Sequence, residues 1–342
     1  MFVCGLHRSG TSVLGRNIAR FENCTGFRDT GATEDEGQFL QDVYPVAFTL
    51  GGPGRFGFDP RAHRTEASAL LTPQNVARLK SSWQGYWDRS KTICVEKTPA
   101  NILMTRFLQA AFPNSYFVVI RRHPVAVSIA TQKMWKINKS ALHSLFEHWL
   151  LCHEVFDQDK QHLERVYELS YEDYVANPSR HHQEIAAFIG TRLPVLRRTV
   201  DEFRQVVQVA NKITSVPDNT LETVSGAHNE KYFAYWSQLL NHSMFRQYYR
   251  HIAGKYEREF NRYGYSLTKG LVGGGDLLCD RGNIPAAVGT WLCLGANACA
   301  LTFRLAAKAK EQLGKTMPKA VVKKPTRVPH TVSLSEETVD IR

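Results

Sequence analysis

A glycine-rich loop near the start of the chain has the residue types that bind a phosphate or sulfate group. Gly5-Leu6-His7-Arg8-Ser9-Gly10-Thr11-Ser12 places its two glycines five positions apart and ends in a hydroxyl residue. Such glycines let backbone amides curl around an anion, and a following helix directs its positive end at that anion. A Walker loop has lysine directly after the second glycine, but Thr11 stands there and the cation is Arg8. The loop therefore favours an anion held by a planar guanidinium over magnesium–ATP chemistry.

Strands alternating with helices must position this loop. The apolar run Phe2-Val3-Cys4 predicts a strand directly before it, and residues 11–21 predict a helix directly after it. Three further apolar runs predict strands, each followed by a helical pattern: residues 92–95, 116–120 and 166–169, then 102–112, 124–133 and 178–189. This alternation predicts an α/β fold with a P-loop-type, doubly wound, mostly parallel sheet flanked by helices. Residues 27–59 lack periodicity, so we expect an insert over the ligand edge of the sheet. A further helical stretch is predicted from about Glu230 to Asn261.

The composition changes beyond the predicted sheet. We expect a P-loop domain over residues 1–268, a glycine-rich linker over 269–283, and an extension over 284–342. That extension begins with twenty uncharged residues, 284–303, which is just enough to span a bilayer. Their glycines and polar residues favour a helix packed on the protein or on a membrane surface. A basic, disordered tail follows, and contact with a membrane surface through residues 284–327 is one prediction.

The overall composition limits the classes of partner that we expect. Lys and Arg outnumber Asp and Glu by 43 to 32, which favours anionic ligands. No nucleic-acid-binding motif is present, and basic residues gather in the tail, so we expect no nucleic acid partner. Seven scattered cysteines and the absence of an HExxH motif predict neither disulfides nor a metal site. A cytoplasmic location follows if the natural chain does not begin further upstream.

Three further stretches follow the loop in order along the chain: Glu96-Lys97-Thr98-Pro99, residues 117–124 and residues 169–178. Together with the loop they resemble the sulfotransferase superfamily, whose members take a sulfuryl group from 3′-phosphoadenosine 5′-phosphosulfate (PAPS). The loop resembles the RSGT loop of the branch that holds tyrosylprotein sulfotransferases and many bacterial enzymes. Glu96-Lys97-Thr98-Pro99 resembles the EKTP motif of that branch, and residues 117–124 (FVVIRRHP) resemble its VxRxP strand end. Residues 169–178 (LSYEDYVANP) resemble its YEDL…NP segment. The resemblance covers roughly residues 1–265 and implies a sulfotransferase.

The resemblance also implies how the nucleotide is held. Arg122, two residues before Pro124, is expected on the 3′-phosphate. The family's serine usually stands eight residues later, where this chain has Ala130, so Ser128 is the remaining candidate. Further candidates are a tyrosine beside the nucleotide, a late cation and the loop itself: Tyr171, Lys231, and Arg8, Ser9, Gly10, Thr11 and Ser12.

For the reaction itself, the resemblance implies a glutamate base in the segment after the first helix. Glu36 is favoured there, with Glu34 second, and His7 in the loop is the rival base. Lys97 is expected to neutralise charge on the transferring or leaving group. Because cationic side chains and amides can stabilise that charge, no metal is required.

Two other functions stay open from the sequence. One is a P-loop kinase or other NTPase, which the missing Walker lysine disfavours, and the other is a non-catalytic anion-binding module. The acceptor of a sulfotransferase would be a hydroxyl of a glycan or small-molecule alcohol, with a tyrosyl peptide as the alternative. Its site would be built by variable inserts at residues 27–59 and 135–161. The sequence predicts no oligomeric state.

Overall fold

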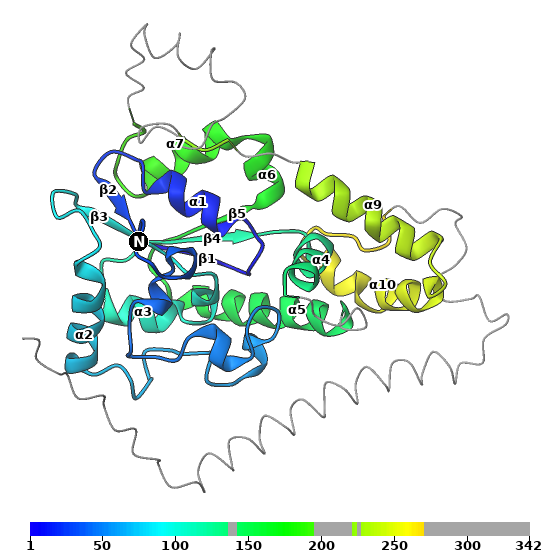
Figure 1. Ribbon diagram of the computed structural model, residues 1–342, viewed down its shortest axis with the longest axis horizontal. Coiled ribbons are helices and arrows are strands. Elements are labelled where there is room, and N and C mark those ends of the chain that lie inside the picture. Colours follow the sequence, from blue (N-terminus) through cyan, green and yellow to red (C-terminus); the bar gives the residue numbers. More distant parts are fainter. Residues whose placement is uncertain (136–141, 195–220, 224–226, 270–342) are drawn as a thin grey trace, which may run out of the picture. The chain divides into compact units, whose positions relative to one another are not determined.

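A parallel sheet of five strands forms the centre of the molecule (Figure 1). The computed structural model describes residues 1–135, 142–194, 221–223 and 227–269, which all belong to one compact unit. The strands lie in the order β2-β3-β1-β4-β5, and every neighbouring pair is parallel. Their bounds are β1 Phe2–Gly5, β2 Cys24–Gly26, β3 Ile93–Lys97, β4 Phe117–Arg121 and β5 Val166–Ser170. The predicted α/β fold with a parallel sheet is confirmed.

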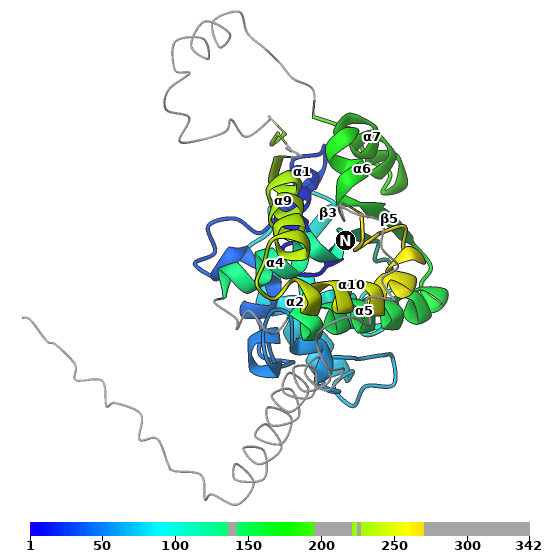
Figure 2. The same cartoon turned by 90° about the vertical axis from the view of Figure 1, so that its right-hand side faces the viewer.

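Helices cover both faces of this sheet. Figures 1 and 2 show α1, α6 and α7 over one face and α2, α3 and α5 over the other. The helices are α1 Thr11–Ile18, α2 Pro73–Gln84, α3 Thr105–Ala111, α4 Pro124–Met134, α5 Leu142–Asp159, α6 Tyr171–Ala176, α7 Pro178–Phe188, α9 Ala227–Asn241 and α10 Arg246–Asn261. Local signals start several of them. Thr72 caps α2 ahead of Pro73, and Ser170 caps α6 by accepting a hydrogen bond from the Asp173 amide.

Alternation along the strands separates two apolar cores. Val3, Val118 and Ile120 face the core shared with α1, α6 and α7. Phe117 and Val119 face the opposite core, which α3, α5 and α10 complete. Because successive side chains of a strand point to opposite faces, a strand buried on both faces is apolar along its buried length, as β4 is from Phe117 to Ile120.

Several predicted elements differ from the structure. The edge strand β2 and helix α2 were not predicted, since three residues carry no periodicity and α2 has only two buried side chains. The single helical pattern expected near residues 230–261 is two helices, α9 and α10. Between them the Ser243 hydroxyl accepts a hydrogen bond from the Phe245 amide at 3.1 Å, a local turn that competes with the helix. Within residues 135–161, expected as an acceptor-site insert, lies α5 with the fully buried Trp149.

Beyond Lys269, the predicted linker and the extension over residues 284–342 lie outside the described residues. Within the part of the chain that is described, no helix is both long enough and apolar enough to cross a membrane. The described cysteines, Cys4, Cys24, Cys94 and Cys152, are free thiols.

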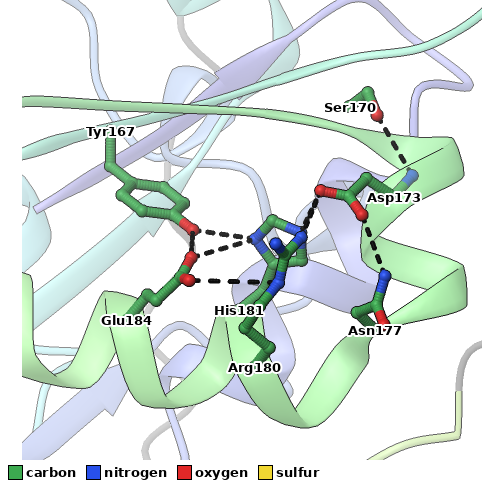
Figure 3. A network of polar contacts seen from close by, with 7 residues as sticks. All are labelled: Tyr167, Ser170, Asp173, Asn177, Arg180, His181 and Glu184. Atoms are coloured by element: carbon green, nitrogen blue, oxygen red, sulfur yellow. Dashed lines mark hydrogen bonds and ion pairs between the residues drawn. The ribbon is translucent and has the colours of Figure 1, made fainter.

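A cluster of polar side chains fastens α6 and α7 to β5, and we call Tyr167, Asp173, Arg180, His181 and Glu184 the outer cluster (Figure 3). The Tyr167 hydroxyl lies 2.8 Å from His181 Nδ1 and 2.5 Å from a Glu184 oxygen. On the other side of the ring, His181 Nε2 lies 3.0 Å from Asp173, which also pairs with Arg180. All five side chains thus have partners within the cluster.

Candidate functional site

The glycine-rich loop lies at the carboxyl end of the central strand β1, where parallel α/β sheets bind ligands. Arg8 and Gly10 have positive φ angles of 71° and 97°, which turn the chain into α1 at Thr11. A Cβ atom at Gly10 would lie 2.6 Å from the Tyr171 ring. Gly10 is therefore required both for the turn and for the close approach of Tyr171.

Three buried side chains at the loop have polar atoms without a hydrogen-bond partner among the described residues. They are the Ser9 hydroxyl, both ring nitrogens of His7 and the Ser128 hydroxyl. Buried polar groups are nearly always satisfied, so these atoms fit a polar or anionic ligand or ordered water. Burial, with the charge of Lys97, lowers the pKa of His7 to about 3 and keeps its imidazole neutral.

His7 and Ser128 line the same small cavity, together with Thr131 and His148. Its volume of about 10 Å³ is the room of one water molecule. The structure therefore places Ser128 beside His7, with no hydrogen bond from its hydroxyl to Arg122 among the described residues.

Arg122 connects the loop to α9. Its guanidinium donates two hydrogen bonds to Asn229 Oδ1, at 2.8 and 2.6 Å, and one to the Arg8 carbonyl at 2.7 Å. The same group lies 4.1 Å from the centroid of the Tyr171 ring. Asn229 is held in turn by Glu172 at 2.9 Å. Arg8, Arg122 and Tyr171, which the sequence predicted at one site, thus lie together.

Lys231 follows Asn229 by two residues on α9 and is exposed. Its Nζ atom lies 5.2 Å from the centroid of the Tyr232 ring. Tyr232 itself lies 5.8 Å from the Arg122 guanidinium. The structure therefore places Lys231 on the helix that holds Arg122.

A buried ion pair lies at the carboxyl end of β3. Lys97 Nζ donates to Glu36 Oε1 at 3.1 Å and to the Glu34 carbonyl at 3.0 Å, while Gln38 donates to Glu36 Oε2 at 2.5 Å. The Lys97 stem lies against α1, where a Cβ atom at Gly15 would stand 2.9 Å from the Lys97 Cβ. Glu34 is exposed and contacts Lys97 through its main chain alone. The structure therefore brings Glu36, and not the Glu34 carboxylate, to the lysine.

Burial is the main influence on the Glu36 carboxylate. Only 5% of Glu36 and 8% of Lys97 is exposed. Burial raises the pKa of Glu36, and Lys97 and Gln38 oppose that rise. A carboxylate whose pKa is raised is a stronger base than an ordinary one, which suits it to accept a proton.

Sequence reasoning missed four residues that hold this site. Gln38 binds Glu36, and Glu96 binds the neighbouring main chain. Asn229 holds Arg122, and Glu172 accepts a hydrogen bond from Asn229. A charged residue at the end of a buried strand was the one available signal for Glu96. No spacing in the sequence indicates the other contacts, and those of Asn229 join segments far apart in the chain.

Solved structures of sulfotransferases resemble the fold at low sequence identity. One is a sulfotransferase from Alicyclobacillus acidocaldarius, at 14% identity and a TM-score of 0.37, with 60% of this chain and 89% of that chain covered. Another is the sulfotransferase domain of the Synechococcus PCC 7002 olefin synthase, at 15% identity and a TM-score of 0.37, covering 69% and 93%. A third is the sulfotransferase domain of the curacin biosynthetic pathway, at 14% identity and a TM-score of 0.41, covering 78% and 97%.

Sequence comparison gives a family. Among proteins with curated descriptions, none matches the chain significantly. A model of the sulfotransferase family matches residues 1–194, which is more than half of the 342 residues and includes the loop, the Glu36–Lys97 pair, Arg122 and Tyr171. The chain therefore belongs to the sulfotransferase family.

Proposed function

We propose that this chain transfers a sulfuryl group from PAPS to an acceptor hydroxyl, with Glu36 as the base. The observation that carries the proposal is the buried Glu36–Lys97 pair, 3.1 Å apart, beside an anion-binding loop. A carboxylate of raised pKa supports proton abstraction, and the lysine supports stabilisation of developing negative charge. Membership of the sulfotransferase family supports the reaction class.

Nucleotide binding in this proposal uses the loop and Arg122. The unpartnered Ser9 hydroxyl and the first amides of α1, from Thr11 and Ser12, suit the 5′-phosphosulfate, and Arg8 adds charge there. Arg122 is assigned to the 3′-phosphate because its guanidinium is buried without a carboxylate partner among the described residues. The Tyr171 ring lies against the Arg122 guanidinium and against Gly10 of the loop. Lys231 and Ser128 stay predictions as further contacts.

Proton and bond changes balance as follows. Glu36 accepts the proton of the acceptor hydroxyl, whose oxygen forms a bond to sulfur. The bond between sulfur and the bridging oxygen of the 5′-phosphate breaks, and adenosine 3′,5′-bisphosphate leaves. Lys97 and Arg8 are assigned to neutralise charge on the transferring group, so that their side chains supply what Mg²⁺ supplies in phosphoryl transfer.

The acceptor is proposed as a hydroxyl of a glycan or small-molecule alcohol, with a tyrosyl peptide as the alternative. Residues 27–59 are assigned to the acceptor side because they carry Glu36 and include the aromatic pair Phe39 and Phe48. Phe48 is 46% exposed, although it is large and apolar. An exposed aromatic side chain on the segment that carries the base suits the carbon skeleton of an acceptor.

The nucleotide assignment is tested by calorimetric titration with adenosine 3′,5′-bisphosphate in the presence of EDTA. Wild-type protein should bind, and Arg8→Ala should weaken binding about tenfold or more, because it removes a charge-assisted contact. Arg61→Ala is the matched control, since Arg61 is an exposed arginine paired with Asp59. Failure of the wild type to bind, or equal affinity in Arg8→Ala and wild type, would contradict the assignment.

A further inference from the structure

The peptide that follows Glu36 is held from both sides. The Gly37 amide donates to Glu96 Oε1 at 3.0 Å, and the Gly37 carbonyl accepts from the Trp83 indole at 2.9 Å. A Cβ atom at Gly37 would lie 2.6 Å from Glu96 Oε1. The main chain next to Glu36 is therefore fixed by direct contact with the end of β3.

Glu96 is a buried carboxylate without a cation. It is 1% exposed, and among the described residues no basic side chain pairs with it. Instead its oxygens accept from the Thr98 hydroxyl at 2.5 Å and the Asn101 amide at 2.6 Å. Burial, with the charge of Glu36 as a smaller cause, raises its pKa to about 7. Burying a carboxylate without a cation costs free energy, and the hydrogen bonds that Glu96 accepts offset part of that cost.

Two neighbouring residues of β3 thus hold Glu36 from opposite faces of the sheet. Lys97 points to the α1 side and binds the carboxylate, whereas Glu96 points to the other side and binds the following amide. A second chain of hydrogen bonds links Glu96 to Glu36 through Thr98. The Thr98 hydroxyl donates to Glu96 and accepts from the Gln38 main-chain amide at 3.4 Å. Gln38 then binds the free oxygen of Glu36.

We propose that Glu96 is a positioning residue for the base: by holding the Gly37 amide, it keeps the Glu36 carboxylate at Lys97 and directed at the acceptor. The inference rests on the proposed role of Glu36. Displacement of a catalytic group by about 1 Å can reduce a rate about 100-fold. Loss of Glu96 should therefore reduce kcat more than it reduces nucleotide affinity.

The test compares Glu96→Ala with Glu96→Gln. The rate is measured with sulfur-labelled PAPS and a panel of simple alcohols, and affinity with adenosine 3′,5′-bisphosphate. Glu96→Ala removes the acceptor for the Gly37 amide, so kcat should fall about 10-fold to 100-fold with nucleotide affinity unchanged. Glu96→Gln keeps an oxygen for that amide and should recover most of kcat.

A wild-type kcat in Glu96→Ala overturns the inference, and so does an equal loss of kcat and nucleotide affinity. If Glu96→Ala does not fold, Gly37→Ala tests the same contact, since its Cβ meets Glu96. Gly85→Ala is the matched control, because nothing lies within 4 Å of a Cβ there. A normal kcat in Gly37→Ala would also overturn the inference.

Glu36→Gln separates this inference from the proposed function. If Glu36→Gln loses activity while Glu96→Ala keeps it, the positioning role alone is wrong. If Glu36→Gln keeps full activity, the base assignment is wrong and the positioning role falls with it.

Discussion

The Glu36–Lys97 pair and the outer cluster are built from the same kinds of residue but differ in burial. The side chains of Lys97 and Glu36 are 10% and 6% exposed, whereas Arg180 and Asp173 of the outer cluster are 50% and 44% exposed. Water screens the exposed pair, so it adds little to stability. In the buried pair, by contrast, burial raises the pKa of the Glu36 carboxyl group.

The surroundings of the two groups differ as well. Every outer-cluster side chain has a partner within the cluster, which fastens α7 to β5 (Figure 3). Near Glu36 and Lys97, the loop leaves the His7 and Ser9 polar atoms unpartnered among the described residues. Polar groups that satisfy one another indicate a structural fastening, and unsatisfied ones beside a perturbed carboxylate indicate a site.

The largest expected effect is that of Glu36→Gln. Loss of a general base should reduce kcat by about 10²–10⁴-fold and leave affinity for adenosine 3′,5′-bisphosphate unchanged. In the wild type, kcat should fall as the pH drops through the raised pKa of Glu36, because the protonated carboxyl cannot accept a proton.

Glu34→Gln is the matched control for this variant, since the Glu34 side chain is exposed and contacts Lys97 only through its carbonyl. Steady-state rates across pH measure both variants. Equal rates in Glu36→Gln and wild type would show that the Glu36–Lys97 pair is no more functional than the outer cluster.

A smaller effect is expected from Asn229→Ala. The change removes two hydrogen bonds from the Arg122 guanidinium, which then loses its orientation. Affinity for adenosine 3′,5′-bisphosphate should fall about tenfold, and calorimetry measures it. Asn75→Ala on α2, whose amide binds the Leu70 carbonyl, is the control. An unchanged affinity would show that Arg122 needs no support from α9.

The smallest effect is expected from Asp173→Asn in the outer cluster. The change removes the charge that pairs with Arg180 and His181, while Asn177 can still donate to the remaining oxygen. The melting temperature should fall slightly, and kcat and nucleotide affinity should not change. A substantial fall in kcat would show that the two regions are coupled.

The central part of the fold follows from the sequence because its signals are local. The strands before the loop and at residues 116–120 are apolar runs, and the structure places them at Phe2–Gly5 and Phe117–Arg121. Strand β2 has no such signal, because three residues at an edge gain their conformation from pairing with β3. The division of the last helical pattern into α9 and α10 depends on a serine turn without glycine or proline.

For the site, the motifs identified the residues that bring charge but not those that hold them. Glu36, Lys97 and Arg122 stand in recognisable positions of the sequence. Glu96 and Asn229 act through contacts between residues 59 and 107 positions apart, which only the fold creates. Gln38 contacts Glu36 two positions away, but no motif marks it. Ser128 shows the same limit, because the turn of α4 directs its hydroxyl to the cavity beside His7.

The pairing of β3 with β1 sets Phe2 against Glu96 and Val3 against Lys97. Since side chains alternate along a strand, a shift of the register by a single residue would exchange the faces to which Glu96 and Lys97 point. The lysine would then enter the α2 side, and the glutamate would enter the α1 side. One inserted or deleted residue within β3 would therefore place each of these two charged side chains on the opposite face of the sheet. The register of this short strand therefore determines the positions of both charged side chains as well as the packing of the sheet.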